Sequence, residues 1–235
     1  MKKLLLLVAS VLLAHTLTAA ETEAKPDAKT QAKNAARKLA DQTGYTWIAT
    51  TQIEGAGQNS RMGPQEGKAE KGGYTHVVFT LNNNEIELAF KGGKSAIKLE
   101  GDWQSAEDLE GGDRDWIAGR LKIFKAAAGE ALELADMAKA LAGGDGGVLS
   151  GDLTEVGAKE MFSRNGRRSV EAKDAKGSVK FWLKDGALVK YEFHLEGKMT
   201  INDEERAVQR TTTVEIKQVG ATKVSLPDEA KKKLS

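Results

Sequence analysis

The sequence predicts an α+β fold in which helices cover one side of an antiparallel β-sheet. Between Ser178 and Gly197, two runs of alternating apolar and charged residues flank Asp185-Gly186, the pattern of a β-hairpin with one apolar face. Strand patterns before residue 101 and after residue 168 enclose a region in which apolar residues recur at helical spacing. The expected order is a short helix, a meander, a group of helices and a closing meander.

The first twenty residues have the composition of a secretory signal peptide. Lys2 and Lys3 precede an apolar run, and Thr18-Ala19-Ala20 supplies small residues for cleavage. We expect cleavage near Ala20, a flexible leader over residues 21–30 and a single domain over residues 31–235. The apolar run is short for a bilayer span and no later stretch is longer, so we expect a periplasmic or secreted protein without stable membrane insertion.

Composition excludes several classes of chemistry. The chain has no cysteine, which removes disulfides, a thiol nucleophile and thiolate metal ligands. Removing Lys2 and Lys3 from the 35 basic residues leaves 33 against 34 acidic residues, so the mature chain is nearly neutral. We therefore expect no nucleic-acid partner.

The first half of the chain predicts a helix and a meander. Small apolar residues at helical spacing after Thr30 predict a helix that stops at Gly44, and residues 55–67 are expected to form a polar loop. Asn82-Asn83-Asn84 and Gly92-Gly93 are good turn formers between strand patterns. The strands are expected at residues 45–53, 74–81, 85–91 and 96–100.

The second half predicts helices and then strands. Helical spacing appears in residues 116–124, 132–141 and 153–162, the last with Asp152 and Glu155 in the spacing of a capping box. The glycines at 143–147 are interpreted as a linker. Strands are expected at residues 169–173, 178–197 as a hairpin, and 211–219, giving eight or nine in all. Pro227 is expected to close the ordered region before a basic tail.

No catalytic constellation stands out. His76 and His194 are distant in sequence and make a poor zinc site without cysteine, and no Gly-x-Ser-x-Gly elbow occurs. Acidic residues fall in polar segments, where nothing raises a pKa for general acid catalysis. We expect no enzyme activity, no metal and no cofactor. Arg164, Arg167 and Arg168 form the densest basic cluster, interpreted as a solvated turn, with attraction to anionic lipid headgroups as the alternative.

Residues 179–190, VKFWLKDGALVK, resemble a strand, tight turn and strand of the superfamily that contains the periplasmic lipoprotein-localisation factor LolA and mycobacterial lipid-carrier lipoproteins. Residues 211–226 share this resemblance. It implies a strongly curved sheet that forms an incomplete barrel, with helices plugging the concave side and acyl chains bound between them. Mycobacterial members are commonly anchored through a lipidated cysteine, which this chain lacks, so a freely diffusing form is expected.

Large apolar side chains can point to one side of the predicted sheet or to the helices that cover it. Ordinary core packing and an apolar cavity both explain them, because ligand pockets are lined by the same residue types. If there is a cavity, its ligand contacts are expected to be Trp47, Trp116, Phe124, Phe181, Leu183, Tyr191, Phe193 and Leu195.

Two functions remain open. The first is an exported carrier or chaperone that shelters a lipid or lipoprotein acyl chain. The alternative is an envelope interaction or scaffold protein with the same fold, a filled core and a protein partner. Trp182 falls on the charged face of its strand, where an exposed aromatic suggests a partner or a covering helix. A secreted hydrolase is a more distant third.

Overall fold

The computed structural model describes residues 26–55, 63–164, 173–201 and 204–235. The expected signal peptide and most of the leader lie outside these residues, as do much of the 55–67 loop, Arg167 and Arg168. Within the described residues, no helix is both long and apolar enough to cross a membrane.

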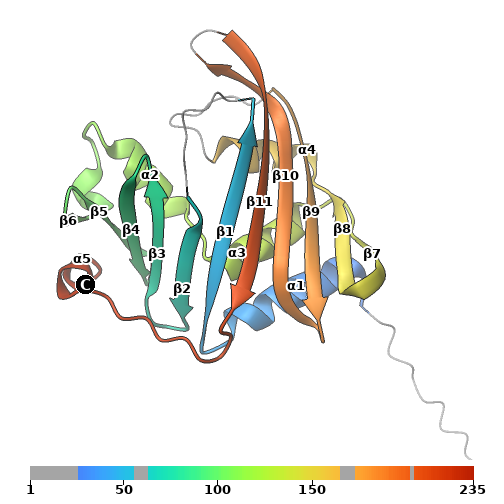
Figure 1. Cartoon of the computed structure of the whole chain (residues 1–235), viewed down its shortest axis with the longest axis horizontal. Helices are drawn as coiled ribbons and strands as arrows, with labels where there is room; N and C mark the ends of the chain where they lie inside the picture. The colour runs from blue at the N-terminus through green and yellow to red at the C-terminus, as the bar shows by residue number, and fades with distance from the viewer. Residues whose placement is uncertain (1–25, 56–62, 165–172, 202–203) are drawn as a thin grey trace, which may run out of the picture.

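The described strands form one open antiparallel sheet, which confirms the predicted α+β class. The sheet order is β6-β5-β4-β3-β2-β1-β11-β10-β9-β8-β7, so the first and second meanders join where β1 pairs with β11 (Figure 1). The strands are β1 (Gly44–Glu54), β2 (Gln65–Glu70), β3 (Thr75–Leu81), β4 (Asn84–Lys91), β5 (Lys94–Leu99), β6 (Asp102–Ser105), β7 (Ala142–Gly143), β8 (Val148–Asp152), β9 (Lys173–Lys184), β10 (Ala187–Ile201) and β11 (Glu204–Lys217).

Tight turns explain why neighbouring strands pair in register. The β9–β10 turn has φ values of 51° at Asp185 and 72° at Gly186, and two positive φ angles are the mark of a type I′ hairpin turn. Gly92-Gly93, between β4 and β5, has the same signs. The twist of such turns matches the right-handed twist of the strands, so these short sequences set the register of long hairpins.

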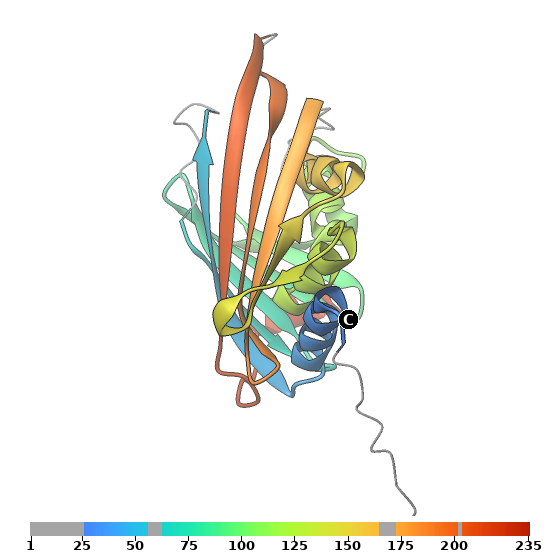
Figure 2. The same cartoon turned by 90° about the vertical axis from the view of Figure 1, so that its right-hand side faces the viewer.

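Helices cover the concave face of this sheet. Figure 2 shows α1, α3 and α4 along one side of the strands, and α2 lies over the β3–β5 region in Figure 1. Asp27 caps the start of α1 by accepting a hydrogen bond from the Thr30 backbone N–H at 3.1 Å. The helices are α1 (Ala28–Ala40), α2 (Asp115–Ile123), α3 (Ala127–Met137), α4 (Glu155–Ser163) and α5 (Asp228–Lys233), with short 3-10 turns η1 (Glu107–Leu109) and η2 (Asp145–Gly147).

The C-terminal segment differs from the expected basic tail. Pro227 lies just before α5, which packs on the convex face of β4–β6. A second hydrophobic cluster forms there from Ala89, Ala96 and Trp103 of the sheet together with Val224, Leu226, Ala230 and Leu234 of the C-terminal segment. The three consecutive lysines of α5 lie between Ala230 and Leu234, and two apolar residues form too short a pattern to show this face in the sequence.

Four strands were not predicted, and β2 shows the reason. Its buried residues are Gly67 and Ala69, which are too small to give the alternation of large apolar and polar residues that predicts a strand. Gly67 pairs with Trp47 of β1, and a Cβ added at Gly67 would lie 2.0 Å from Cζ2 of the Trp47 ring. The indole of Trp47 therefore occupies the space that a larger β2 side chain would fill. The other unpredicted strands are β6, β7 and β8, which are short and lie toward the edges of the sheet.

Two local predictions in the second half need correction. The N-cap of α4 is Thr154, which accepts a hydrogen bond from the Gly157 N–H at 3.0 Å, so Asp152 is not part of a capping box. In β10, the register shifts between Leu188 and Lys190. This β-bulge turns Leu188 into the core at 3% exposure and leaves Val189 at 38%, which breaks the simple alternation.

Candidate functional site

The eight residues expected to contact a ligand divide between two parts of the molecule. Phe181, Tyr191 and Leu195 are 0% exposed and Phe193 and Trp47 are 3% exposed. Leu183 and Phe124 are half-buried, and Trp116 is 38% exposed on α2. The structure brings the β9–β10 residues together in a closed core and places Phe124 and Trp116 at the α2 side. That these side chains contact a ligand stays a prediction.

The β8–β11 half of the concave face is closed by three helices with small inward residues. Ala35 and Ala36 of α1 and Ala131 and Ala135 of α3 are at most 2% exposed. Alanine lets the helix backbones approach the sheet closely, so the large side chains of β9 and β10 fill the remaining space. We call this region the closed half.

The β3–β5 region is covered less completely. Apolar side chains on the concave face stay half-buried although they pack against the main core, namely Phe79, Ile86, Phe90 and Leu99. Ile117 of α2 and Phe124, the residue that follows α2, are also half-buried, and Ile123 is 48% exposed. We call this region, with α2, the α2 half.

A pocket of about 250 Å³ lies in the α2 half, where the α2–α3 connection passes the β4–β5 turn. Phe90 and Phe124 line it as a stacked pair with ring centroids 4.3 Å apart and an interplanar angle of 12°. Leu121, which is 4% exposed, continues the apolar wall into the main core. Thr75 and Ser95 add two hydroxyl groups. The pocket is therefore lined by both polar and apolar groups.

Helix α2 is weakly fixed at its ends. Its N-cap residue, Arg114, makes no side-chain capping hydrogen bond, and the helix has only nine residues. Its described ion pairs join exposed groups, as Lys122 does with Glu110 at 2.5 Å and Arg114 with Glu100 at 2.9 Å. Short helices without caps are marginal and exposed ion pairs contribute little, so these features give α2 little stability of its own.

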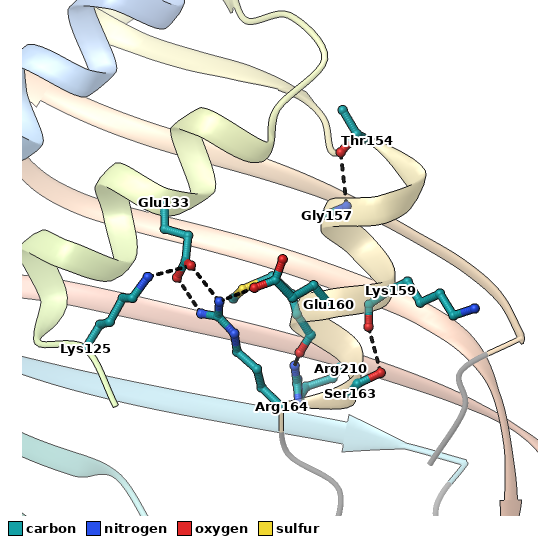
Figure 3. A network of polar contacts seen from close by, with 10 residues as sticks. Lys125, Glu133, Thr154, Gly157, Lys159, Glu160, Ser163, Arg164 and Arg210 are labelled. Carbon is teal, nitrogen blue, oxygen red and sulfur yellow. Dashed lines mark hydrogen bonds and ion pairs between the residues drawn. The ribbon is translucent and has the colours of Figure 1, made fainter. Parts of the chain in front are cut away.

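A polar network instead joins α3 to α4 (Figure 3). The Arg164 guanidinium donates to both oxygens of the Glu133 carboxylate and to Glu160, and Lys125 donates to Glu133 at 2.6 Å. Burial alone would raise the pKa of Glu133, but the hydrogen bonds from Arg164 and Lys125 outweigh it and lower this pKa. The network holds two helices of the closed half together.

A second polar group lies deeper, between α3 and the sheet. Tyr191 donates its hydroxyl hydrogen to Glu130 at 2.6 Å, and burial raises the pKa of Glu130. Arg210 of β11, 6% exposed, donates to the Met161 carbonyl at 2.8 Å, and burial lowers its pKa to about 10. These groups fix α3 and α4 to β10 and β11 without offering an open catalytic cleft.

The histidines and Trp182 have ordinary polar partners. His76 Nε2 lies 3.1 Å from a Glu87 oxygen, and His194 Nδ1 lies 3.0 Å from the Thr211 hydroxyl. Trp182 is half-buried and not fully exposed as expected, because the Lys190 ammonium lies 4.3 Å from its ring centroid. Over the described ranges, no group of three or more His, Asp and Glu residues could hold a metal ion.

Sequence reasoning missed Phe90, Leu121 and Ser95 as pocket residues. Phe90 had a usable signal, because it shares the apolar face of β4 with Leu88 and is the last apolar residue before the Gly92-Gly93 turn. Ser95 had none, since its hydroxyl enters the pocket only through the pairing of β4 with β5.

Comparisons with known proteins find similarity in structure alone. No protein-family model matches the chain, and no curated protein matches it. The structure is similar to LprF from Mycobacterium bovis, with 12% identity over 86% of this chain and 97% of that chain and a TM-score of 0.44. It is also similar to a LolA superfamily protein from Nitrosomonas europaea, with 9% identity over 87% and 97% of the chains and a TM-score of 0.35. Both similarities are distant in sequence and in structure.

Proposed function

We propose that this protein is an exported, non-enzymatic carrier that binds the acyl chain of a lipid or lipoprotein in the α2 half. The observation that supports this is the pocket of about 250 Å³ beside Phe90 and Phe124, in the region where the helix layer leaves apolar side chains half-exposed. An amphiphile places its chain against such a surface and removes both from water.

Desolvation supplies the affinity. Each buried methylene contributes about 0.8 kcal/mol, so roughly ten methylenes give about 8 kcal/mol, which corresponds to a dissociation constant near micromolar. A chain longer than the pocket requires α2 to move away from β5. The missing side-chain cap of α2 and its exposed ion pairs make this the least demanding movement. In this proposal, the acyl chain binds and is released when α2 moves away from β5.

The expected ligand contacts take different roles in this proposal. Phe124 lines the pocket, and Trp116 lies in the first turn of α2. Both would therefore contact an entering acyl chain before the buried β9–β10 residues do. The β9–β10 residues, which include Phe181 and Tyr191, meet it only if α1, α3 or α4 also moves. We place the carrier in the periplasm or outside the cell, after removal of the signal peptide.

The scaffold alternative has one observation in its favour. The closed half buries its large side chains at 0–3% exposure, as a protein with a filled core does. In that case the α2 half would contact a protein and not a lipid. The two functions differ in whether an isolated acyl chain binds.

The test is the binding of a fluorescently labelled palmitate to the full mature chain. Thr75 lines the pocket from the concave face of β3, so Thr75→Phe fills it with a residue that strands favour. Thr80→Phe is the matched control, because Thr80 is exposed on the opposite face of the same strand. We expect saturable binding by the wild type and Thr80→Phe, and a loss of at least about tenfold in Thr75→Phe. Circular dichroism checks that both variants fold.

Native mass spectrometry of protein purified without detergent from its own cells gives the complementary result. We expect an added mass that solvent extraction removes and that is absent in Thr75→Phe. A single ligand-free mass, together with no saturable binding of palmitate, would exclude the carrier and favour the scaffold alternative.

A further inference from the structure

The pocket in the α2 half has a cationic rim. Lys91 and Lys94 flank the Gly92-Gly93 turn, and Lys122 lies in the last turn of α2. All three line the pocket, and none of the residues lining it is acidic. Three positive charges from two separate parts of the chain therefore surround one opening.

The present partners of these lysines are one half-buried ring and two exposed groups. Lys91 lies over the Tyr74 ring, with its Nζ 4.8 Å from the centroid, and Lys94 donates to the main-chain oxygen of Ser235. Lys122 pairs with Glu110 at 2.5 Å, and 54% of its side chain and 46% of that of Glu110 remain exposed. Exposed pairs of this kind contribute little, so an incoming anion can compete for all three ammonium groups.

Two residues with hydroxyl groups also line the pocket. Ser95 is 4% exposed and lines the pocket, and Thr75 lines it from β3. Hydroxyls can donate to an anionic oxygen, and the adjacent Phe90 and Phe124 rings can contact only apolar groups. The pocket therefore combines exposed cationic groups with hydroxyl and apolar groups.

We propose that this pocket selects amphiphiles with an anionic headgroup, a phosphate or a carboxylate, and holds that headgroup at Lys91, Lys94 and Lys122. The proposal rests on the proposed carrier function, because the acyl chain must enter the same pocket. The order of the groups sets the orientation: the headgroup stays at the β4–β5 turn, and the chain runs past Phe90 and Phe124 beneath α2.

The test compares two lipids with the same oleoyl chain, each below the concentration at which it aggregates. Lysophosphatidic acid carries an anionic headgroup, and monooleoylglycerol carries none. We expect the wild-type chain to bind lysophosphatidic acid at least about tenfold more tightly, with a preference that weakens as salt increases. The triple variant Lys91→Gln, Lys94→Gln, Lys122→Gln should lose this preference and bind both lipids with similar affinity.

A charge-matched control separates a local site from a general effect of net charge. Lys176, Lys180 and Lys184 are exposed on the convex side of β9, far along the sheet order from the pocket. Their triple replacement by Gln should leave the preference for lysophosphatidic acid unchanged. If this control removes the preference as well, or if the rim variant retains it, the proposal is wrong.

Two further outcomes are informative. If wild type binds the two lipids equally, the carrier function stands and the headgroup inference fails; if neither lipid binds, the carrier function itself fails. Glycerol 3-phosphate separates a lipid headgroup from a free phosphate. We expect it to bind at least about a hundredfold more weakly than lysophosphatidic acid, because it buries no methylenes against the Phe pair. Equal affinity for the two would show a free-anion site and overturn the lipid assignment.

Discussion

The closed half and the α2 half share one sheet but differ in how their concave face is covered. In the closed half, alanine-rich faces of α1 and α3 bury Phe181 and Tyr191 completely. In the α2 half, one nine-residue helix leaves Phe79, Phe90 and Phe124 half-buried. The difference indicates that one half supplies the stability of the fold and the other supplies accessible apolar surface.

The polar contacts follow the same division. In the closed half, Arg164 and Lys125 hold the Glu133 carboxylate, and Lys33 of α1 pairs with Asp136 of α3 at 2.5 Å. The ion pairs described for α2 join exposed groups at its two ends. The proposed opening of α2 would therefore break only exposed ion pairs of that helix among those described.

The largest expected effect is the loss of Phe181. Phe181→Ala empties a fully enclosed site and should lower the free energy of unfolding by about 3–5 kcal/mol, whereas Phe124→Ala should lower it by about 1 kcal/mol. Urea unfolding measures both. Phe124→Ala should in turn weaken palmitate binding. Equal losses of stability in the two variants would mean that the halves do not differ in packing.

Arg164→Gln should have the next largest effect. It leaves the Glu133 carboxylate, 15% exposed, without its bidentate partner, and we expect a loss of about 2 kcal/mol at neutral pH. Because the pKa of Glu133 is lowered in the fold, its contribution is present above its ordinary pKa of 4.5 and is lost as pH falls below that value. The difference between variant and wild type should therefore shrink in acid.

Arg206→Gln is the control for this prediction. Arg206 pairs with Glu204 at 2.8 Å, but both side chains are largely exposed, so its loss should change stability by less than about 0.5 kcal/mol. Unfolding curves of the two variants at several pH values give the comparison. A loss of the same size in both variants would show that the α3–α4 network stabilises the fold no more than an exposed ion pair does.

A smaller, pH-dependent effect is expected at Glu130. Burial raises its pKa above 4.5, so the wild type loses stability as pH rises from that value through the raised pKa. Arg210 and Arg164 oppose this shift, and Glu133 adds to it. In Glu130→Gln the amide oxygen still accepts from Tyr191. The stability of the variant relative to wild type should therefore increase as pH rises above 4.5. A difference that does not change with pH would contradict the prediction.

The smallest expected effect concerns α2 itself. A Cβ added at Gly119 meets no atom within 4 Å, so Gly119→Ala should stabilise α2 by about 0.5–1 kcal/mol. Amide hydrogen exchange in α2 should slow, and palmitate should associate more slowly. Gly129→Ala in α3 is the control, because its Cβ would make only an ordinary contact at 3.5 Å. It should leave exchange in α2 unchanged; if it slows that exchange equally, α2 does not open on its own.

The sequence predicted the features that depend on neighbouring residues. Asp185-Gly186 and Gly92-Gly93 specify tight turns. The alternation of apolar and polar residues on either side of Asp185-Gly186 specifies the apolar face of the β9–β10 hairpin. The helices between residues 116 and 162 were predicted because apolar residues recur there every three or four positions. These signals suffice because a turn or an amphipathic face is set by a few consecutive side chains.

Features that depend on distant residues were not predictable in this way. β2 is a strand because the Trp47 ring covers Gly67, and α5 is ordered because it packs on Trp103 of β6. The bulge at Val189 reverses the direction of one side chain without changing the apolar pattern.

By itself, the sequence determined the fold class, the hairpin turns and the apolar composition of the concave face, because these arise from local conformational preferences and periodicity. Only the tertiary structure decided which apolar residues are closed and which stay accessible. That distinction depends on how many helices pack over each strand, and it places Phe181 in the closed half and Phe124 beside Phe90 and the lysine rim.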